Sequence, residues 1–176
     1  QVVEDDAPFE TFTESGASYM GFAVSAMLAS ALADAPRYPI AFAGDGSFMM
    51  NPQVLIDAVQ HKLRGMIIVF DNRRIAAISG LQRAQYEADF ATNDSVEVDY
   101  VALASAVKGV FAVDGGTSLT SLRDALDSAY SYQGVSLITV PTYWGEDSRG
   151  SIPAYGAWNV GNWCEDVQRR YREQSL

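Results

Sequence analysis

The segment from Gly44 to Asn72 constrains the fold of this chain more than any other stretch. It reads GDGSFMMNPQVLIDAVQHKLRGMIIVFDN and follows the apolar run Ile40–Ala43, a pattern that predicts a strand, a turn, a helix and a second strand. Glycines on both sides of Asp45 permit a sharp turn and a close approach of the backbone to a ligand. Met66–Phe70 is continuously apolar, as are strands buried inside parallel sheets. We therefore expect two neighbouring parallel strands joined by a helix.

Polar residues follow both of these predicted strands. Asn51-Pro52 is typical of a helix start, because a proline in the first turn loses no hydrogen bond, and Gly65 is expected to end the helix. Since the carboxyl ends of parallel strands meet at one edge of a sheet, Asp45 and Asn72 should emerge there together. That edge is where open α/β sheets bind ligands.

The rest of the chain alternates helical and extended patterns. Phe22–Ala33 has almost no polar face and predicts a helix that is buried nearly all round. Residues 73–98 are predicted to form a long functional loop with at most short helical pieces. The remaining elements are a helix capped by Asp99 and ending near Val107, a strand over Val110–Val113, a helix capped by Ser118 with Leu119, Leu122, Ala125, Leu126 and Ala129 at helical spacing, a strand over Val135–Val140, and a tail with a short helix from about Trp163.

This alternation predicts one α/β domain with a three-layer, doubly wound and mostly parallel sheet that carries helices on both faces. We expect a single domain over residues 1–176, with 141–176 as a C-terminal closing tail. The single Cys164 fits a reducing compartment, and no apolar run approaches the ~18 residues of a membrane span, so the expected location is cytoplasmic. The sequence shows no signal peptide, and its start at Gln1 suggests a chain that is processed, trimmed or taken from something longer.

The net charge of −10 limits the classes of partner. Such a surface repels phosphate groups, which argues against nucleic acid and anionic membranes. An anionic ligand would need a cation or main-chain N–H groups to bind here.

Gly44-Asp45-Gly46, followed after twenty-five residues by Asn72, resembles the motif of thiamine-diphosphate enzymes. The resemblance implies a Mg²⁺ ion bound by the side chains of Asp45 and Asn72 and by the main-chain carbonyl of Arg74. Diphosphate oxygens and water would complete the octahedral oxygen shell that Mg²⁺ prefers. The main-chain N–H groups of Gly46 and Ser47 would hold the diphosphate.

A second block, Ser18–Phe22, resembles the T-M-G-[FY] segment of acetolactate synthase-like enzymes. In that family the methionine is a wedge under the cofactor, a role that falls here to Met20, and the carbonyl of Ser18 would accept a hydrogen bond from the aminopyrimidine. Ordinary core packing is the alternative interpretation for Met20. The full set of cofactor-binding residues that the resemblance implies is Ser18, Tyr19, Met20, Gly44, Asp45, Gly46, Ser47, Asn72, Arg74 and Ala76.

Within the superfamily, the segment DNRRIAAISGL is most similar to the ring-opening cyclohexanedione and trihydroxycyclohexanedione hydrolases. Arg74 and Ile75 stand where that family usually has a glycine and an aromatic residue. Family members carry a helix before the Met-Gly turn, and Gln1 lies only 19 residues before Met20, so we expect this segment to be missing, disordered or supplied by another chain.

The resemblance also implies that catalysis needs a second component. In this superfamily a glutamate on a separate pyrimidine-binding domain activates the cofactor, and no segment of this chain matches that domain, so no catalytic residue is assigned here. We therefore expect a split enzyme, a hetero-oligomer of the α2β2 type whose partner is a pyrimidine-binding subunit or domain. Its reaction would be lyase or transferase chemistry on a small keto substrate: decarboxylation or carboligation of a 2-keto acid, or cleavage of a 1,2-diketone.

Two other functions remain as alternatives. One is a degenerate, non-catalytic subunit that serves assembly or regulation, which Arg74, Ile75 and the short N-terminal segment favour. The other is a nicotinamide-binding domain, which requires a Gly-x-Gly-x-x-Gly turn that this chain lacks after Gly46. His61, near the end of a predicted helix, is interpreted as a surface residue.

Overall fold

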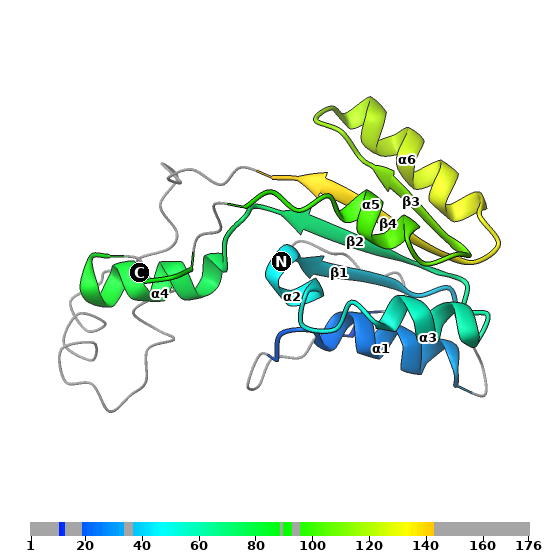
Figure 1. Cartoon of the computed structure of the whole chain (residues 1–176), viewed down its shortest axis with the longest axis horizontal. Coiled ribbons are helices and arrows are strands. Elements are labelled where there is room, and N and C mark those ends of the chain that lie inside the picture. The colour runs from blue at the N-terminus through cyan, green and yellow to red at the C-terminus, as the bar shows by residue number, and fades with distance from the viewer. Residues whose placement is uncertain (1–10, 13–18, 34–36, 89, 93–95, 143–176) are drawn as a thin grey trace.

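The computed structural model describes residues 11–12, 19–33, 37–88, 90–92 and 96–142. Helices and strands alternate along this part of the chain (Figure 1). The strands are β1 (Ile40–Gly44), β2 (Gly65–Asp71), β3 (Val110–Asp114) and β4 (Val135–Pro141). The helices are α1 (Phe22–Ala31), α2 (Asp45–Phe48), α3 (Val54–Gln60), α4 (Ala76–Tyr86), α5 (Tyr100–Ser105) and α6 (Leu119–Ser131).

The four strands form one sheet in the order β1-β2-β4-β3, and every neighbouring pair is parallel. Parallel strands need crossover connections, which the intervening helices provide. The predicted α/β class is therefore confirmed.

Helices cover both faces of the sheet, which makes three layers (Figure 1). On one face, α1, α3 and α5 pack against side chains such as Ala43, Val69 and Leu137. On the other face, α6 packs against Ile68 and Ile138. This burial of apolar side chains on both faces of β2 and β4 explains their continuously apolar sequences.

Among the described residues, the helix on the α6 face does not extend over β1. Phe42 and Phe70 lie on that face with their rings stacked at a centroid distance of 6.2 Å, and both rings are exposed, together with Ile40.

Side-chain caps stand at the starts of α5 and α6, where the sequence predicts them. Asp99 Oδ1 accepts a hydrogen bond of 2.8 Å from the main-chain N–H of Ala102 at the start of α5. Ser118 forms a capping box with Ser121 at the start of α6. Both caps confirm the predicted helix starts.

The helix predicted between Asn51-Pro52 and Gly65 is wrong in its bounds. The chain enters α2 at Asp45 itself and forms α3 only from Val54. Between them the main-chain bonds span three residues, as from Asn51 N–H to the Phe48 carbonyl, because Pro52 has no N–H with which to continue an α-helix. The chain leaves α3 through Lys62 in a left-handed conformation (φ 54°), and Gly65 is the first residue of β2.

The prediction of a loop over residues 73–98 is also wrong for its first half, where α4 spans 11 residues. The N–H of Ser79 donates 2.9 Å to the Ile75 carbonyl at the start of this helix. The Gln82 side chain accepts from the N–H of Phe90 at 2.7 Å and donates to its carbonyl at 3.1 Å. Ala, Leu and Gln favour a helix in this segment, and the loop interpretation gave these propensities too little weight.

Two burial predictions need correction. Val24 and Met27 of α1 are buried against the sheet, but Ser25, Ala29 and Ser30 are exposed, so the helix is not buried all round. Leu119, at the first position of α6, is 86% exposed and does not join the core.

The predicted helix from Trp163 and nearly all of the predicted closing tail lie outside the described residues. Within those residues, no helix combines the length and the apolar character needed to cross a membrane.

Candidate functional site

The carboxyl ends of β1 and β2 bring two acidic residues side by side. The strands pair in register with Gly44 opposite Phe70, so the next residues, Asp45 and Asp71, fall next to each other. Asn72 follows immediately. The predicted meeting of Asp45 and Asn72 at one sheet edge is therefore what the topology produces.

Asp45 is 4% exposed, and its environment disfavours the charged form. Burial raises its pKa above the usual range, and the neighbouring carboxylate of Asp71 raises it further through charge repulsion and a side-chain hydrogen bond. The main-chain N–H groups of Gly46 and Arg73 oppose this rise, and the bond from Gly46 to Asp45 Oδ1 is 2.7 Å long. A cation at this position would relieve the repulsion between the two carboxylates.

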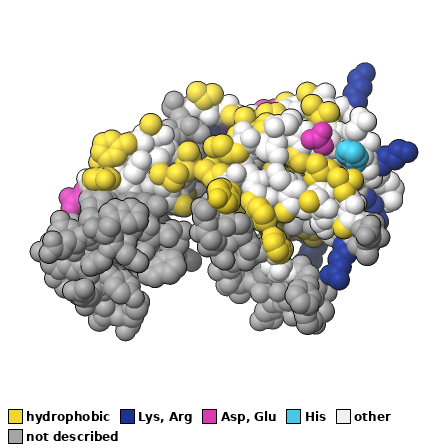
Figure 2. Space-filling model, turned by 90° about the horizontal axis from the view of Figure 1, so that it is seen from below, with side chains coloured by type: hydrophobic (Ala, Val, Ile, Leu, Met, Phe, Trp, Pro, Cys, Tyr) yellow, Lys and Arg dark blue, Asp and Glu magenta, His cyan; other side chains and the backbone are white. Residues whose placement is uncertain are grey.

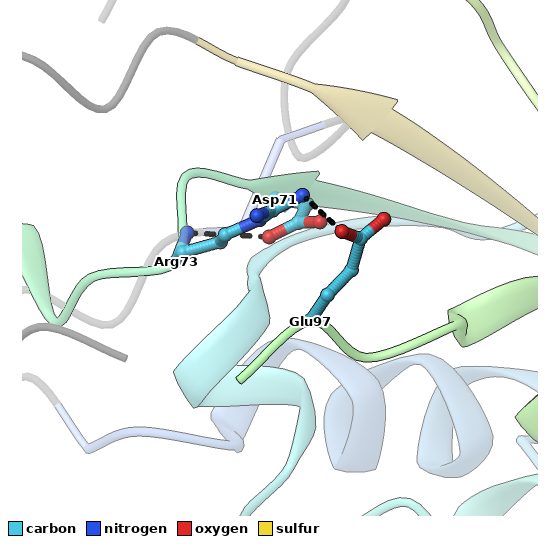
Figure 3. Close-up of polar contacts among 3 residues, drawn as sticks. All are labelled: Asp71, Arg73 and Glu97. Atoms are coloured by element: carbon cyan, nitrogen blue, oxygen red, sulfur yellow. Dashed lines mark hydrogen bonds and ion pairs between the residues drawn. The ribbon is translucent and has the colours of Figure 1, made fainter. Parts of the chain in front are cut away.

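The chain turns sharply after β2, and side chains hold the turn (Figure 3). Asp71 Oδ1 accepts a hydrogen bond of 3.2 Å from the N–H of Arg73, and Asn72 Oδ1 accepts one of 3.0 Å from the N–H of Arg74. Arg73 has a left-handed backbone with φ of 50°. Its guanidinium pairs with Glu97 at 3.1 Å, which joins the turn to the segment before α5.

The Met-Gly block lies against the Gly-Asp-Gly block, although the two are far apart in sequence. The N–H of Gly21 donates 2.8 Å to Oγ of Ser47. A Cβ placed on Gly46 would lie 3.4 Å from Cε of Met20 and 3.4 Å from Cγ1 of Ile75. Met20 and Ile75 thus approach the same glycine from two separate segments.

The backbone conformations of Gly44 and Gly46 do not require glycine. Gly44 is extended (φ −71°, ψ 158°), so any residue could adopt this conformation, and a Cβ there would meet no atom within 4 Å. Asp45-Gly46 forms the first turn of α2 rather than an isolated tight turn. Gly21 differs, because its φ of 86° is left-handed and favours glycine.

The remaining predicted site residues are placed as follows. Tyr19 is 71% exposed, Ala76 is an exposed residue at the start of α4, and Arg74 is half-buried. Ser18 lies outside the described residues. His61 is exposed at the end of α3, as expected, and Figure 2 shows the chain's one histidine at the surface in cyan.

The described residues hold no group of three or more His, Cys, Asp or Glu side chains that could bind a metal ion. A cation at this edge would therefore need amide, main-chain and ligand oxygens in addition to the carboxylates. This donor set is hard and oxygen-only, which fits Mg²⁺ and not a soft metal.

Sequence reasoning missed the part that Asp71 and Ile75 play here. Asp71 directly follows the predicted strand Met66–Phe70, and the register of β1 against β2 places it beside Asp45. Its position directly before Asn72 was the available signal. Ile75 was noted only as a departure from a family pattern, and no local signal predicted its approach to Gly46.

Comparisons with known proteins agree on one family. The model of the thiamine pyrophosphate enzyme family, C-terminal TPP-binding domain, matches residues 1–140. The chain is 37% identical over 120 residues to 3D-(3,5/4)-trihydroxycyclohexane-1,2-dione hydrolase of Lacticaseibacillus casei. The matched residues make up 64% of this chain and 19% of that protein. It is also 31% identical over 99 residues to the acetolactate synthase isozyme 1 large subunit of Escherichia coli (strain K12). Here the matched residues make up 56% of this chain and 18% of that protein.

A solved structure gives the same result. The thiamine diphosphate-dependent 4-hydroxybenzoylformate decarboxylase of Rhodococcus jostii RHA1 superposes with a TM-score of 0.66 at 27% identity, over 73% of this chain and 24% of that chain. The chain thus spans less than a quarter of the length of each of these three relatives.

Proposed function

The chain belongs to the family of C-terminal thiamine pyrophosphate-binding domains, and from this premise we propose that it anchors thiamine diphosphate and Mg²⁺ in an enzyme that cleaves or forms a carbon–carbon bond next to a carbonyl group. The approach of Met20 to Gly46 carries this proposal, because it brings the two motif blocks to one place. When bound, the cofactor supplies a nucleophilic carbon and an electron sink.

In this proposal, Met20 is the wedge that shapes the cofactor. Its Cε reaches the Gly46 position of α2, while the Gly21–Ser47 hydrogen bond fixes the turn that carries it. Core packing is the competing role for Met20. Its side chain is half-buried and is not among the fully buried residues of the core, which favours the role at the site.

Asp45, Asn72 and Arg74 are proposed as the protein ligands of Mg²⁺. Asp45 supplies a buried carboxylate oxygen, which is a type of ligand that Mg²⁺ prefers. Asn72 supplies a side-chain amide oxygen and Arg74 its main-chain carbonyl. The cation would in turn neutralise the diphosphate in a chain whose net charge is −10.

No residue of this chain is proposed to activate the cofactor. That role goes to a glutamate on a pyrimidine-binding subunit or domain, and the site would be shared in a hetero-oligomer of the α2β2 type. Exposed apolar side chains close to the site support such a partner, among them Tyr19 (71% exposed), next to Met20, and Met50 (57%), which approaches Gly21. Figure 2 shows apolar side chains spread over the face that includes α1 and α3.

The names of the relatives support a small carbonyl substrate. One acts on a cyclohexane-1,2-dione, one is an acetolactate synthase and one decarboxylates 4-hydroxybenzoylformate. We propose a 2-keto acid or a cyclic 1,2-dione as the substrate class, with lyase or transferase chemistry.

Activity assays test this proposal. The full protein with its partner, supplied with thiamine diphosphate and Mg²⁺, is expected to convert pyruvate or a cyclic 1,2-dione. Asp45→Ala should abolish turnover, whereas the matched control Asp57→Ala, on the exposed side of α3, should retain it. Equal activity of the two variants would contradict the proposed role of Asp45.

A non-catalytic subunit is the second candidate, and the position of Ile75 favours it. Its Cγ1 lies 3.4 Å from the place of a Cβ on Gly46, so the side chain narrows the space beside that glycine. Full activity of a complex that carries both Asp45→Ala and Asn72→Ala would support this alternative.

A further inference from the structure

We propose that Asp71 is a positioning residue for the cation site: its carboxylate holds the main chain of Arg73 in the left-handed conformation, and this hold places the Asn72 side chain and the Arg74 carbonyl. The inference rests on the proposed function, because it concerns the same site. It assigns a role to a residue that is not one of the three proposed ligands.

Asp71 is suited to this role because the sheet fixes its own backbone. It is the last residue of β2 and lies in register with Pro141 of β4. Its carbonyl accepts a hydrogen bond of 2.8 Å from the N–H of Thr142. The carboxylate therefore projects from a rigid strand end, and the turn after it is the part that needs support.

Arg73 is the residue in the turn that needs this support. Its φ of 50° lies in a region that residues other than glycine, asparagine and aspartate rarely occupy. The N–H of Arg73 donates 3.2 Å to Asp71 Oδ1 (Figure 3). The carboxylate of Asp45 is a second acceptor for this N–H. The contact from the Arg73 guanidinium to Glu97 joins side chains that are 36% and 74% exposed, and such pairs contribute little.

The left-handed conformation of Arg73 turns the chain, and this turn fixes the positions of the two other proposed ligands, Asn72 and Arg74. Directly after Arg73, the N–H of Arg74 donates 3.0 Å to Asn72 Oδ1. One hydrogen bond thus couples the Asn72 side chain to the Arg74 peptide. If the Arg73 backbone relaxes, both groups move together, and the cation loses two ligands.

A hydrogen-bond acceptor at position 71 is what this role requires, rather than a negative charge. Asparagine keeps an acceptor oxygen in the place of Oδ1 and also removes the repulsion between position 71 and Asp45. Alanine removes the acceptor at position 71 and leaves the Arg73 N–H with Asp45 alone. The two substitutions therefore separate positioning from charge.

The test is a calorimetric titration of Mg²⁺ into the full protein at saturating thiamine diphosphate. Asp71→Ala should weaken Mg²⁺ binding by about 10- to 100-fold, as loss of a residue behind a metal ligand typically does. Asp71→Asn should stay close to wild type. The double variant Asp71→Ala/Arg73→Gly should recover much of the affinity, because glycine adopts the left-handed conformation without help.

Three outcomes overturn the inference: Asp71→Ala binds Mg²⁺ like wild type, Asp71→Asn binds as weakly as Asp71→Ala, or Arg73→Gly gives no recovery. Thermal unfolding of each variant identifies any that fails to fold, and the recovery by Arg73→Gly cannot come from an unfolded protein. A wild-type protein without Mg²⁺-dependent binding would contradict the proposed function itself, whereas normal wild-type binding with an unaffected Asp71→Ala contradicts the role of Asp71 alone.

Discussion

The N–H of Gly21 donates a 2.8 Å hydrogen bond to Oγ of Ser47, across 26 residues of sequence. This bond joins the turn that carries Met20 to the helix that carries Asp45 and Gly46. Gly21 has a φ of 86° in this turn, a left-handed conformation that glycine adopts without steric cost.

Ser47→Ala is expected to lower both stability and cofactor affinity. The substitution leaves the Gly21 N–H without its acceptor, and loss of one hydrogen bond typically costs about 1 kcal/mol. Denaturant unfolding measures the stability and calorimetry the binding. Ser47→Thr keeps the hydroxyl and serves as the control; an equal loss in Ser47→Thr would show that the hydrogen bond is not the cause.

Gly46→Ala should separate stability from binding. A Cβ at this position sits at ordinary contact distance from Met20 and Ile75, and alanine favours a helix over glycine by about 1 kcal/mol, so the fold should be unharmed or slightly more stable. Binding of thiamine diphosphate should fall at least about tenfold, which is about 1.4 kcal/mol, because the added methyl group occupies the space beside the proposed wedge. Unchanged affinity in calorimetry would contradict a close approach of the cofactor to Gly46.

Asp45→Asn is expected to stabilise the metal-free protein at neutral pH while it removes Mg²⁺ binding. The folded-state pKa of Asp45 is raised, so the native state binds more protons than the unfolded state as pH increases above about 4, and its stability falls over that range. Asparagine retains the acceptor for the Gly46 N–H without the charge. Thermal unfolding in chelator should give a difference between variant and wild type that grows with pH; a pH-independent difference would exclude this cause.

The strands and caps could be predicted because their signals are local. The apolar run of β2, the Asp99 cap and the Ser118 cap are each specified within a few residues. The shared edge of Asp45 and Asn72 followed from parallel topology, and the likeness of the Met20 block to a family motif predicted its place in the site.

Other features depend on contacts that no short segment encodes. The helix α4 follows the helix propensity of its own residues, but the hydrogen bonds of its Gln82 side chain with the Phe90 backbone join positions that no local pattern pairs. The contact of Asp71 with Asp45 depends on the register of two strands. Arg73 is left-handed without being a glycine, so the sequence gives no signal for its conformation. These features are set by tertiary structure.

Arg73→Gly should stabilise the protein slightly. Glycine removes the cost of a left-handed non-glycine residue, about 1–2 kcal/mol, and loses an exposed ion pair that contributes about 0–1 kcal/mol. Glu97→Gln, which removes only the ion pair, should change the free energy of unfolding by less than about 1 kcal/mol. Denaturant unfolding measures both; a marked loss of stability in Arg73→Gly would show that the arginine side chain, and not its backbone, matters.

The most direct test of the central claim is the calorimetric binding of thiamine diphosphate to the full wild-type protein, with Mg²⁺ and then with chelator. We expect saturable binding with Mg²⁺ and its loss in chelator, because Asp45 and Asn72 reach the diphosphate only through the cation. Binding of equal strength in chelator would contradict the metal site, and no binding in either condition would contradict the assignment of a cofactor to this sheet edge.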